Sequence, residues 1–192
     1  MFKRIFILTI VIFSIFLFGC QSKKQTPTTP AVTIEHIKGT FDFDTVLANT
    51  TINNRQISSN SKFKDLGNGF TLGDCFLDLG EFPEYDRDTK FYNLLYSKEK
   101  VGSIEIDLNE KIFELRLEDN ISYIYDMNFN LCSINFDSDL QDIIDVFGVS
   151  DYNDGNDFLR YGKKESSNIA FRFMNYELYA IEINIVGDIT NE

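Results

Sequence analysis

Side chains suited to catalysis are scarce in this sequence. The 192 residues include one histidine, no tryptophan and three cysteines. A Ser-His-Asp or Cys-His site needs a histidine held by a folded scaffold, and His36 lies beside a polar, proline-containing segment. Structural zinc sites draw several His and Cys ligands at close spacing, which this sequence does not offer. The composition therefore favours a non-catalytic protein without a metal or another cofactor.

Basic residues are also few. The chain has 18 Lys and Arg against 30 Asp and Glu, a formal net charge of −12 and a pI of about 4.5. Nucleic-acid binding needs a basic face, so that class is excluded. A disordered acidic tail is excluded as well, because 19 Phe and 9 Tyr are typical of a chain that collapses around a core.

The first twenty residues have the order of a targeting signal. Lys3 and Arg4 precede an apolar run from residue 5 to residue 18, which is short for a membrane-spanning helix of about 20 residues. The run ends in Leu17-Phe18-Gly19-Cys20, and polar residues follow. This ending resembles the lipobox of bacterial lipoproteins. An uncleaved anchor helix with an incidental cysteine is the alternative.

The lipobox resemblance implies that residues 1–19 are a cleaved signal peptide. Cys20 then becomes the first residue of the mature chain and carries a diacylglyceryl group with fatty acyl chains such as palmitate. Acyl chains contribute about 0.8 kcal/mol per buried methylene, so we expect a lipid-anchored protein on the extracytoplasmic face of a cell membrane. Residues 20–39 are polar, contain Pro27 and Pro30, and are typical of a flexible tether.

Two segments in the remaining chain share a helical spacing of apolar residues. The first comprises Leu72, Cys75, Phe76 and Leu79, followed by Gly80, and the second comprises Leu140, Ile143, Ile144 and Phe147, followed by Gly148. This spacing predicts two short amphipathic helices that end at glycine. Thr71 and Ser138 stand at the expected N-caps, and Ser138 with Gln141 matches a capping box.

The segments after the two predicted helices also correspond. Each begins with an acidic, turn-rich stretch, continues to Tyr96 or Tyr161, and leads to a hairpin of alternating strands with turns near residues 109–110 and 175–176. Further strands are expected at residues 121–126 and 130–136. Residues 50–58 predict a hairpin that turns at Asn53-Asn54, and residues 62–67 a helical turn.

These patterns predict an α+β fold. We expect an N-terminal hairpin region at 40–70 and two tandem helix-plus-antiparallel-hairpin units at 71–136 and 137–192, with the helices packed on one face of an antiparallel sheet. A single α+β domain with coincidental patterning is the alternative.

The order of helix, glycine, loop, tyrosine and hairpin over residues 70–186 looks like the tandem repeat of beta-lactamase-inhibitor-like proteins and their outer-membrane-assembly lipoprotein relatives. It is also similar to small uncharacterised lipoproteins of low-GC Gram-positive bacteria. The resemblance implies helices on one sheet face and non-catalytic protein binding by the other. No specific motif matches, so no contact residues carry over.

Strand alternation places a charged set on the face opposite the apolar one. Its members are Ser103, Glu105, Asp107, Glu114, Arg116, Arg172 and Glu182. Arg116 and Arg172 are the best candidates for partner-binding anchors, because arginine is enriched at interface hot spots. Glu105 and Glu182 would belong to the same surface, and a solvated face without a partner is the alternative.

Three further features leave alternatives open. Cys75 and Cys132 could form a disulfide outside the cytoplasm or remain buried thiols. The acidic residues 151–157, with Asp86 and Asp88, suggest weak calcium binding, but an EF-hand pattern fails because Gly155 falls at position five and Gly162 at position twelve. A small-ligand binder, or a hydrolase using paired carboxylates, remains a competing function.

Overall fold

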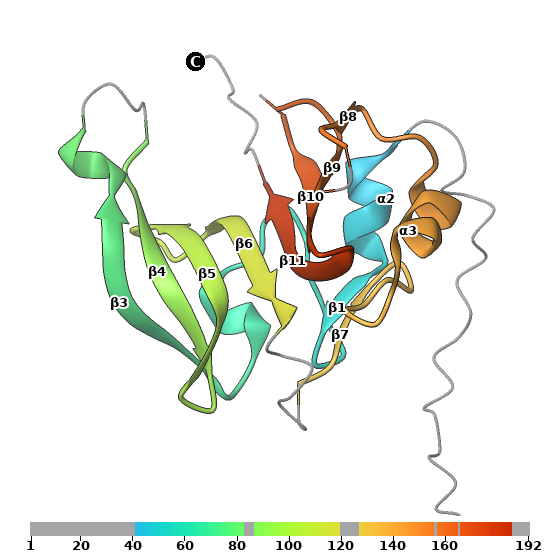
Figure 1. Ribbon diagram of the computed structural model, residues 1–192. Helices are drawn as coiled ribbons and strands as arrows, with labels where there is room; N and C mark the ends of the chain where they lie inside the picture. The colour runs from blue at the N-terminus through green and yellow to red at the C-terminus, as the bar shows by residue number, and fades with distance from the viewer. Residues whose placement is uncertain (1–40, 83–86, 120–126, 156, 165, 186–192) are drawn as a thin grey trace, which may run out of the picture. The chain divides into compact units, whose positions relative to one another are not determined.

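The computed structural model describes residues 41–82, 87–119, 127–155, 157–164 and 166–185. All of them belong to the second of two parts of the chain, residues 1–31 and 32–192. The described residues form mostly antiparallel β-structure, with eleven strands in two sheets and two short α-helices (Figure 1).

The elements follow one another in this order: α2 (Phe43–Ala48), β1 (Thr50–Ile52), β2 (Arg55–Gln56), the 3-10 helix η2 (Phe63–Leu66), β3 (Phe70–Asp78), the 3-10 helix η3 (Leu79–Glu81), β4 (Thr89–Tyr96), β5 (Glu99–Asp107), β6 (Ile112–Glu118), β7 (Phe129–Leu131), α3 (Leu140–Phe147), β8 (Tyr152–Asn153), β9 (Phe158–Tyr161), β10 (Asn168–Met174) and β11 (Glu177–Asn184).

The larger sheet has eight strands in the order β3-β4-β5-β6-β11-β10-β9-β8. Its green-to-yellow half, β3 to β6, and its orange-to-red half, β8 to β11, meet where β6 pairs antiparallel with β11 (Figure 1). Strands from the predicted units 71–136 and 137–192 therefore lie in one sheet. The smaller sheet has the order β2-β1-β7.

The predicted α+β fold class, with helices packed on a sheet, is wrong, because the described chain is mainly β-structure. The helix expected at Leu72–Leu79 is strand β3, and Gly80 lies in η3 instead of ending a helix. Register shifts between Leu72 and Cys75 and between Cys75 and Leu77 interrupt the pairing with β4. Such bulges break the two-residue alternation of a strand, so the apolar residues acquire a helix-like spacing.

Several local predictions are confirmed. Helix α3 covers the second predicted helix and ends at Gly148, whose φ is 78°. Its N-cap is Asp139 instead of Ser138: Asp139 and Asp142 form the capping box, each carboxylate accepting a hydrogen bond from the other's backbone N–H at 2.9 and 3.0 Å. The β1–β2 hairpin turns at Asn53 and Asn54, both with positive φ.

Hairpins β5–β6 and β10–β11 occur as predicted, and Tyr96 and Tyr161 end the strands β4 and β9 that precede them. Of the strand expected at residues 130–136, only the β7 portion forms. The strand expected at 121–126 lies outside the described residues.

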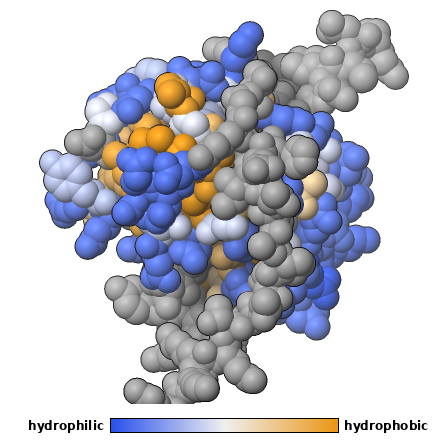
Figure 2. Space-filling model, turned by 90° about the vertical axis from the view of Figure 1, so that its right-hand side faces the viewer, coloured by the Kyte–Doolittle hydropathy of each residue, from blue (hydrophilic) through white to orange (hydrophobic). Residues whose placement is uncertain are grey.

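The core lies on one face of the large sheet. The buried residues on this face include Ile104, Ile106, Leu115, Ile169, Phe171, Ile181 and Ile183. Phe147 of α3 packs against Tyr161 and Phe171 with ring centroids 5.1 and 5.5 Å apart. On the side that carries α2 and α3, apolar residues gather in one area enclosed by hydrophilic residues (Figure 2). No helix in the described part of the chain is long and apolar enough to cross a membrane.

Candidate functional site

The second face of the large sheet carries polar side chains in rows that cross the strands. Ser103 of β5 lies opposite Arg116 of β6, which in turn lies opposite Glu182 of β11. In the next row Glu105 of β5 lies opposite Glu114 of β6. Register thus brings residues as far apart in the sequence as Ser103 and Glu182 into one row, and charges of both signs meet at the centre of the sheet.

Glu182 is the centre of an ion-pair cluster. Its Oε1 accepts hydrogen bonds from Arg116 Nη1 at 3.1 Å and from Arg172 Nε at 2.6 Å, and its Oε2 accepts one from Arg172 Nη2 at 3.2 Å. The Arg172 pairing is bidentate, the geometry in which arginine binds a carboxylate best. The Arg172 guanidinium also lies over the ring of Phe158, 4.9 Å from its centroid. Arg172 is therefore occupied by contacts within the chain.

Glu105 is almost fully buried, with 4% of its surface exposed. It accepts a hydrogen bond from Thr89 Oγ1 at 2.5 Å, and Arg87 NH1 lies 3.9 Å from its Oε1. Its carboxylate is satisfied inside the protein, which is the usual condition for a buried charge.

Glu114 faces Glu105 across the β5–β6 pair. Among the described residues, no comparable hydrogen-bond donor meets its carboxyl group. Burial, followed by the negative charges of Glu182 and Glu105, raises the pKa of Glu114 to about 7, although Arg116 and Arg172 oppose the shift. Like charges directly opposite each other on neighbouring strands are unfavourable, so part of this carboxyl population is protonated near neutral pH.

A groove of about 380 Å³ opens beside Glu114 on the same face. We call it the β3–β6 groove. Its lining residues are Phe76, Phe91, Asn93, Lys100, Ser103, Glu114, Arg116 and Glu118. Gly102 of β5 lies directly against the backbone of β6. Any residue with a Cβ at this position would collide with the carbonyl oxygen of Arg116, so the close approach requires glycine. The close approach of these backbones positions Ser103 beside Arg116.

The rim of the groove is aromatic. The rings of Phe76 and Phe91 lie 6.0 Å apart, and Phe76 is 56% exposed. With Leu77 and Phe82, Phe76 forms a run of exposed large apolar residues along β3 and the end of η3. Strand β3 is an edge strand of the sheet, so this run is open to a partner on its outer side.

The structure gives the four predicted partner-binding residues different surroundings. Arg116 lines the groove, and its side chain is 28% exposed. Arg172 does not line the groove, but it binds Glu182, which also binds Arg116. Glu105 and Glu182 are buried. Sequence reasoning missed Phe76 and Phe91. Phe91 could have been found from the sequence by extending the two-residue alternation of the β5–β6 hairpin to the preceding strand β4. Phe91 lies opposite Glu105 in that pairing and therefore on the same face.

The two candidate disulfide cysteines do not line this groove. Cys75 and Cys132 are both free thiols: Cys75 is exposed on β3, whereas Cys132 is buried, with its Sγ 3.6 Å from the carbonyl oxygen of Val46. Burial raises the pKa of the Cys132 thiol to about 12. Cys20 and His36 lie outside the described residues.

The acidic loop 151–157 is used to stabilise turns where it is described. Asp151 Oδ2 accepts a hydrogen bond from the Gly162 N–H at 2.7 Å, and Asn153 Oδ1 accepts one from the Gly155 N–H at 2.8 Å. Across the described ranges, no group of three or more His, Cys, Asp or Glu side chains is arranged to hold a metal ion.

Comparisons of the chain with known protein families, with curated protein sequences and with solved structures return no match.

Proposed function

We propose that this protein is a lipid-anchored, extracytoplasmic binding protein that captures another protein without catalysing a reaction. The β3–β6 groove is the proposed contact surface, and Cys20 is the proposed point of lipid attachment.

The anchor rests on the N-terminal sequence. A short basic start, an apolar run too short to span a bilayer and a cysteine at its end occur in the order of a lipoprotein signal. An acidic protein body is repelled by anionic lipid headgroups, so a net charge of −12 favours a molecule held through its lipid and not through its surface.

The observation that carries the binding proposal is the exposed Phe76 beside Phe91 at the groove rim. Large exposed aromatic residues next to polar groups are typical of interaction sites. Arg116 lines the same groove, and 28% of its side chain is exposed. Aromatic residues and arginine are the side chains that most often dominate binding energy.

This geometry favours a partner segment that packs an apolar side chain against the exposed ring of Phe76 beside Phe91. The rest of the segment would run along the outer side of β3, because an edge strand offers unpaired backbone groups for β-sheet extension. The bulges in β3 interrupt that edge. Side-chain contacts in the groove would therefore contribute more to binding than a continuous backbone ladder.

The test is site-specific crosslinking in the native membrane. A photoreactive phenylalanine analogue replaces Phe76 in the full-length chain, and a matched protein carries it at Leu108, which is 75% exposed in the β5–β6 turn. We expect a discrete adduct from position 76 that position 108 does not give. Arg116→Met should reduce its yield about tenfold, the effect of losing roughly 1.4 kcal/mol of binding. No adduct, or the same adduct from both positions, would refute the proposal.

A further inference from the structure

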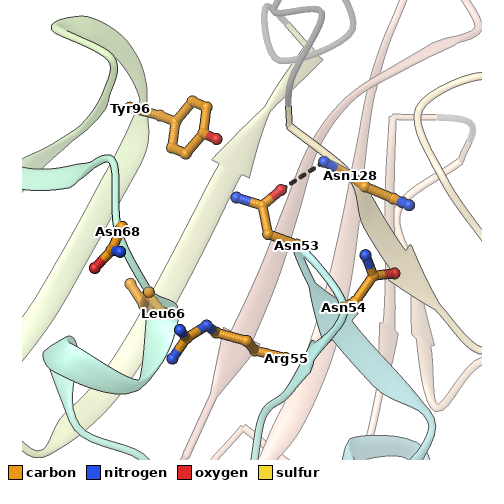
Figure 3. A pocket seen from close by; sticks show the side chains of 8 residues that line it. Asn53, Asn54, Arg55, Leu66, Asn68, Tyr96 and Asn128 are labelled. Atoms are coloured by element: carbon orange, nitrogen blue, oxygen red, sulfur yellow. Dashed lines mark hydrogen bonds between the residues drawn. The ribbon is translucent and has the colours of Figure 1, made fainter.

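A second pocket, of about 300 Å³, lies apart from the β3–β6 groove and shares no lining residue with it. Four segments meet around it: the β1–β2 turn, the loop after η2, the end of β4 and the residues before β7. The lining residues are Asn53, Asn54, Arg55, Leu66, Gly67, Asn68, Tyr96 and Asn128 (Figure 3). Its size is at the lower end of the range for small-molecule sites.

The lining is unusual for so acidic a chain. The protein has 30 acidic and 18 basic residues, yet none of the lining residues is acidic and Arg55 is the one cation among them. No ion pair or hydrogen bond joins the exposed Arg55 side chain to another described residue, and this side chain extends toward Leu66 and Asn68 (Figure 3). A guanidinium in a pocket whose lining residues include no carboxylate favours an anionic ligand.

Free carboxamides surround this cation. Within the described part of the chain, the side chains of Asn54, Asn68 and Asn128 make no hydrogen bond to another residue, and all three residues are exposed. Each carboxamide both donates and accepts. Such groups match a ligand that carries hydroxyls, since a hydroxyl also donates and accepts, whereas a bare anion would use only the donors.

The pocket is built on a defined backbone. Asn53 Oδ1 accepts a hydrogen bond from the Asn128 N–H at 2.8 Å, and the Asn53 N–H donates to the Asn128 carbonyl at 2.6 Å, which joins the β1–β2 turn to the segment before β7 (Figure 3). Gly67 has a φ of +99°, and a Cβ there would lie 2.6 Å from Arg55 Nε. Glycine at this position therefore makes room for the Arg55 side chain.

One wall of the pocket is aromatic. The Tyr96 ring lies at this wall with 8% of the residue exposed, whereas Leu66 is fully buried beneath it and offers a ligand no accessible surface. In Figure 3 the Tyr96 hydroxyl points across the pocket toward Asn53. A small ligand with polar groups around it would match this lining.

We infer that this pocket binds a small hydroxylated carboxylate of monosaccharide size, such as a sugar acid. Arg55 holds the carboxylate, and Asn54 and Asn68 bind hydroxyl groups. This site is independent of the proposed protein-binding groove.

The test is a titration of the full-length chain in detergent, followed by NMR of the asparagine side-chain NH₂ signals. Three probes separate the chemistry: glucuronate carries both carboxylate and hydroxyls, glucose only the hydroxyls, and acetate only the carboxylate. We expect glucuronate to shift the Asn54 and Asn68 signals at a concentration at least about tenfold lower than either of the other probes, because a charge-assisted hydrogen bond contributes about 1.5–3 kcal/mol.

Two variants locate the effect. Arg55→Gln should weaken glucuronate binding about tenfold and leave the weak glucose response unchanged, whereas Lys164→Gln, at an exposed cation outside the pocket, should leave all three titrations unchanged. The inference is overturned if glucuronate does not shift the Asn54 and Asn68 signals, if acetate acts as well as glucuronate, or if Lys164→Gln has the same effect as Arg55→Gln.

Discussion

Glu114 illustrates how the sheet sets the chemistry of one side chain. Its pKa of about 7 lies above the ordinary glutamate value of 4.5, first because of burial and then because of Glu182 and Glu105. The native state therefore binds a proton at Glu114 more tightly than the unfolded state does. Stability from this group is fully present below about pH 4.5 and is lost as the pH rises through 7.

Replacing this carboxyl should change the pH dependence of stability. We expect Glu114→Gln to stabilise the protein at pH 8 by an amount on the order of 2 kcal/mol, since each pKa unit corresponds to about 1.4 kcal/mol. Little change is expected at pH 5, where the wild-type carboxyl is already mainly neutral. Urea unfolding at the two pH values measures the difference. Equal effects at both values would show that Glu114 does not titrate as described.

The paired arginines also differ at this scale. Sequence alternation placed Arg116 and Arg172 on one face, and both do contact Glu182. Only the fold shows that Arg172 is held by Glu182 and Phe158, whereas Arg116 lines an open groove. Alternation reports the face of a residue and not its partners, because partners depend on which strands become neighbours.

At the scale of elements, β3 and α3 show that the same apolar spacing can form different structures. The β3 segment contains Gly73 and Asp74 in its middle, and both have low helix propensity. Pairing with β4 satisfies its backbone instead. Helix α3 has no internal glycine, carries a capping box and ends at Gly148. The β3 segment also has a candidate N-cap, Thr71, and a following glycine, Gly80. Residues inside the segment therefore discriminate better here than the apolar stripe or the residues at its ends.

The position of the α3 cap can be tested directly. We expect Asp139→Ala to lower the free energy of unfolding by about 1 kcal/mol, because the N-cap side chain accepts a hydrogen bond from a backbone N–H that has no partner in the helix. Ser138→Ala, at the cap expected from sequence, should cost less than about 0.5 kcal/mol. Chemical denaturation of both variants decides between the positions, and a larger effect at Ser138 would contradict the structure.

At the scale of the whole molecule, the pairing of β6 with β11 combines strands from two parts of the sequence into one sheet. It places Glu182 next to Arg116, 66 residues away. One face of this sheet is apolar and forms the core, while the other collects the charged cluster and the groove. The proposed lipid anchor would hold this body at the membrane through the N-terminal end of the chain.

The anchor has a simple test at this scale. Cys20→Ser should move the protein from the membrane fraction to the soluble fraction and abolish metabolic labelling with palmitate, because the thioether cannot form. Cys75→Ser, at the exposed cysteine of β3, is the matched control and should leave both properties unchanged. Membrane retention and labelling of the Cys20→Ser protein would exclude lipid attachment at this residue.

Part of the candidate site could be predicted from sequence. Regular hairpins follow a two-residue alternation, so Arg116, Arg172, Glu105 and Glu182 were found on one face. Phe76 was missed because the bulges in β3 imitate helical spacing. The pocket lined by Asn54, Asn68 and Asn128 could not be predicted from a local sequence motif, since its residues come from separate segments of the chain.

The sequence by itself determined the signal-like N-terminus, the turns at Asn53-Asn54 and Asn175-Tyr176, and helix α3, because each depends on residues close together in the chain. Only the tertiary structure decided that residues 70–78 form an edge strand, that β6 pairs with β11, and that Arg172 pairs with Glu182. These outcomes depend on contacts between distant segments. Strand neighbours, burial and the distance between charges arise only when the sheet is assembled.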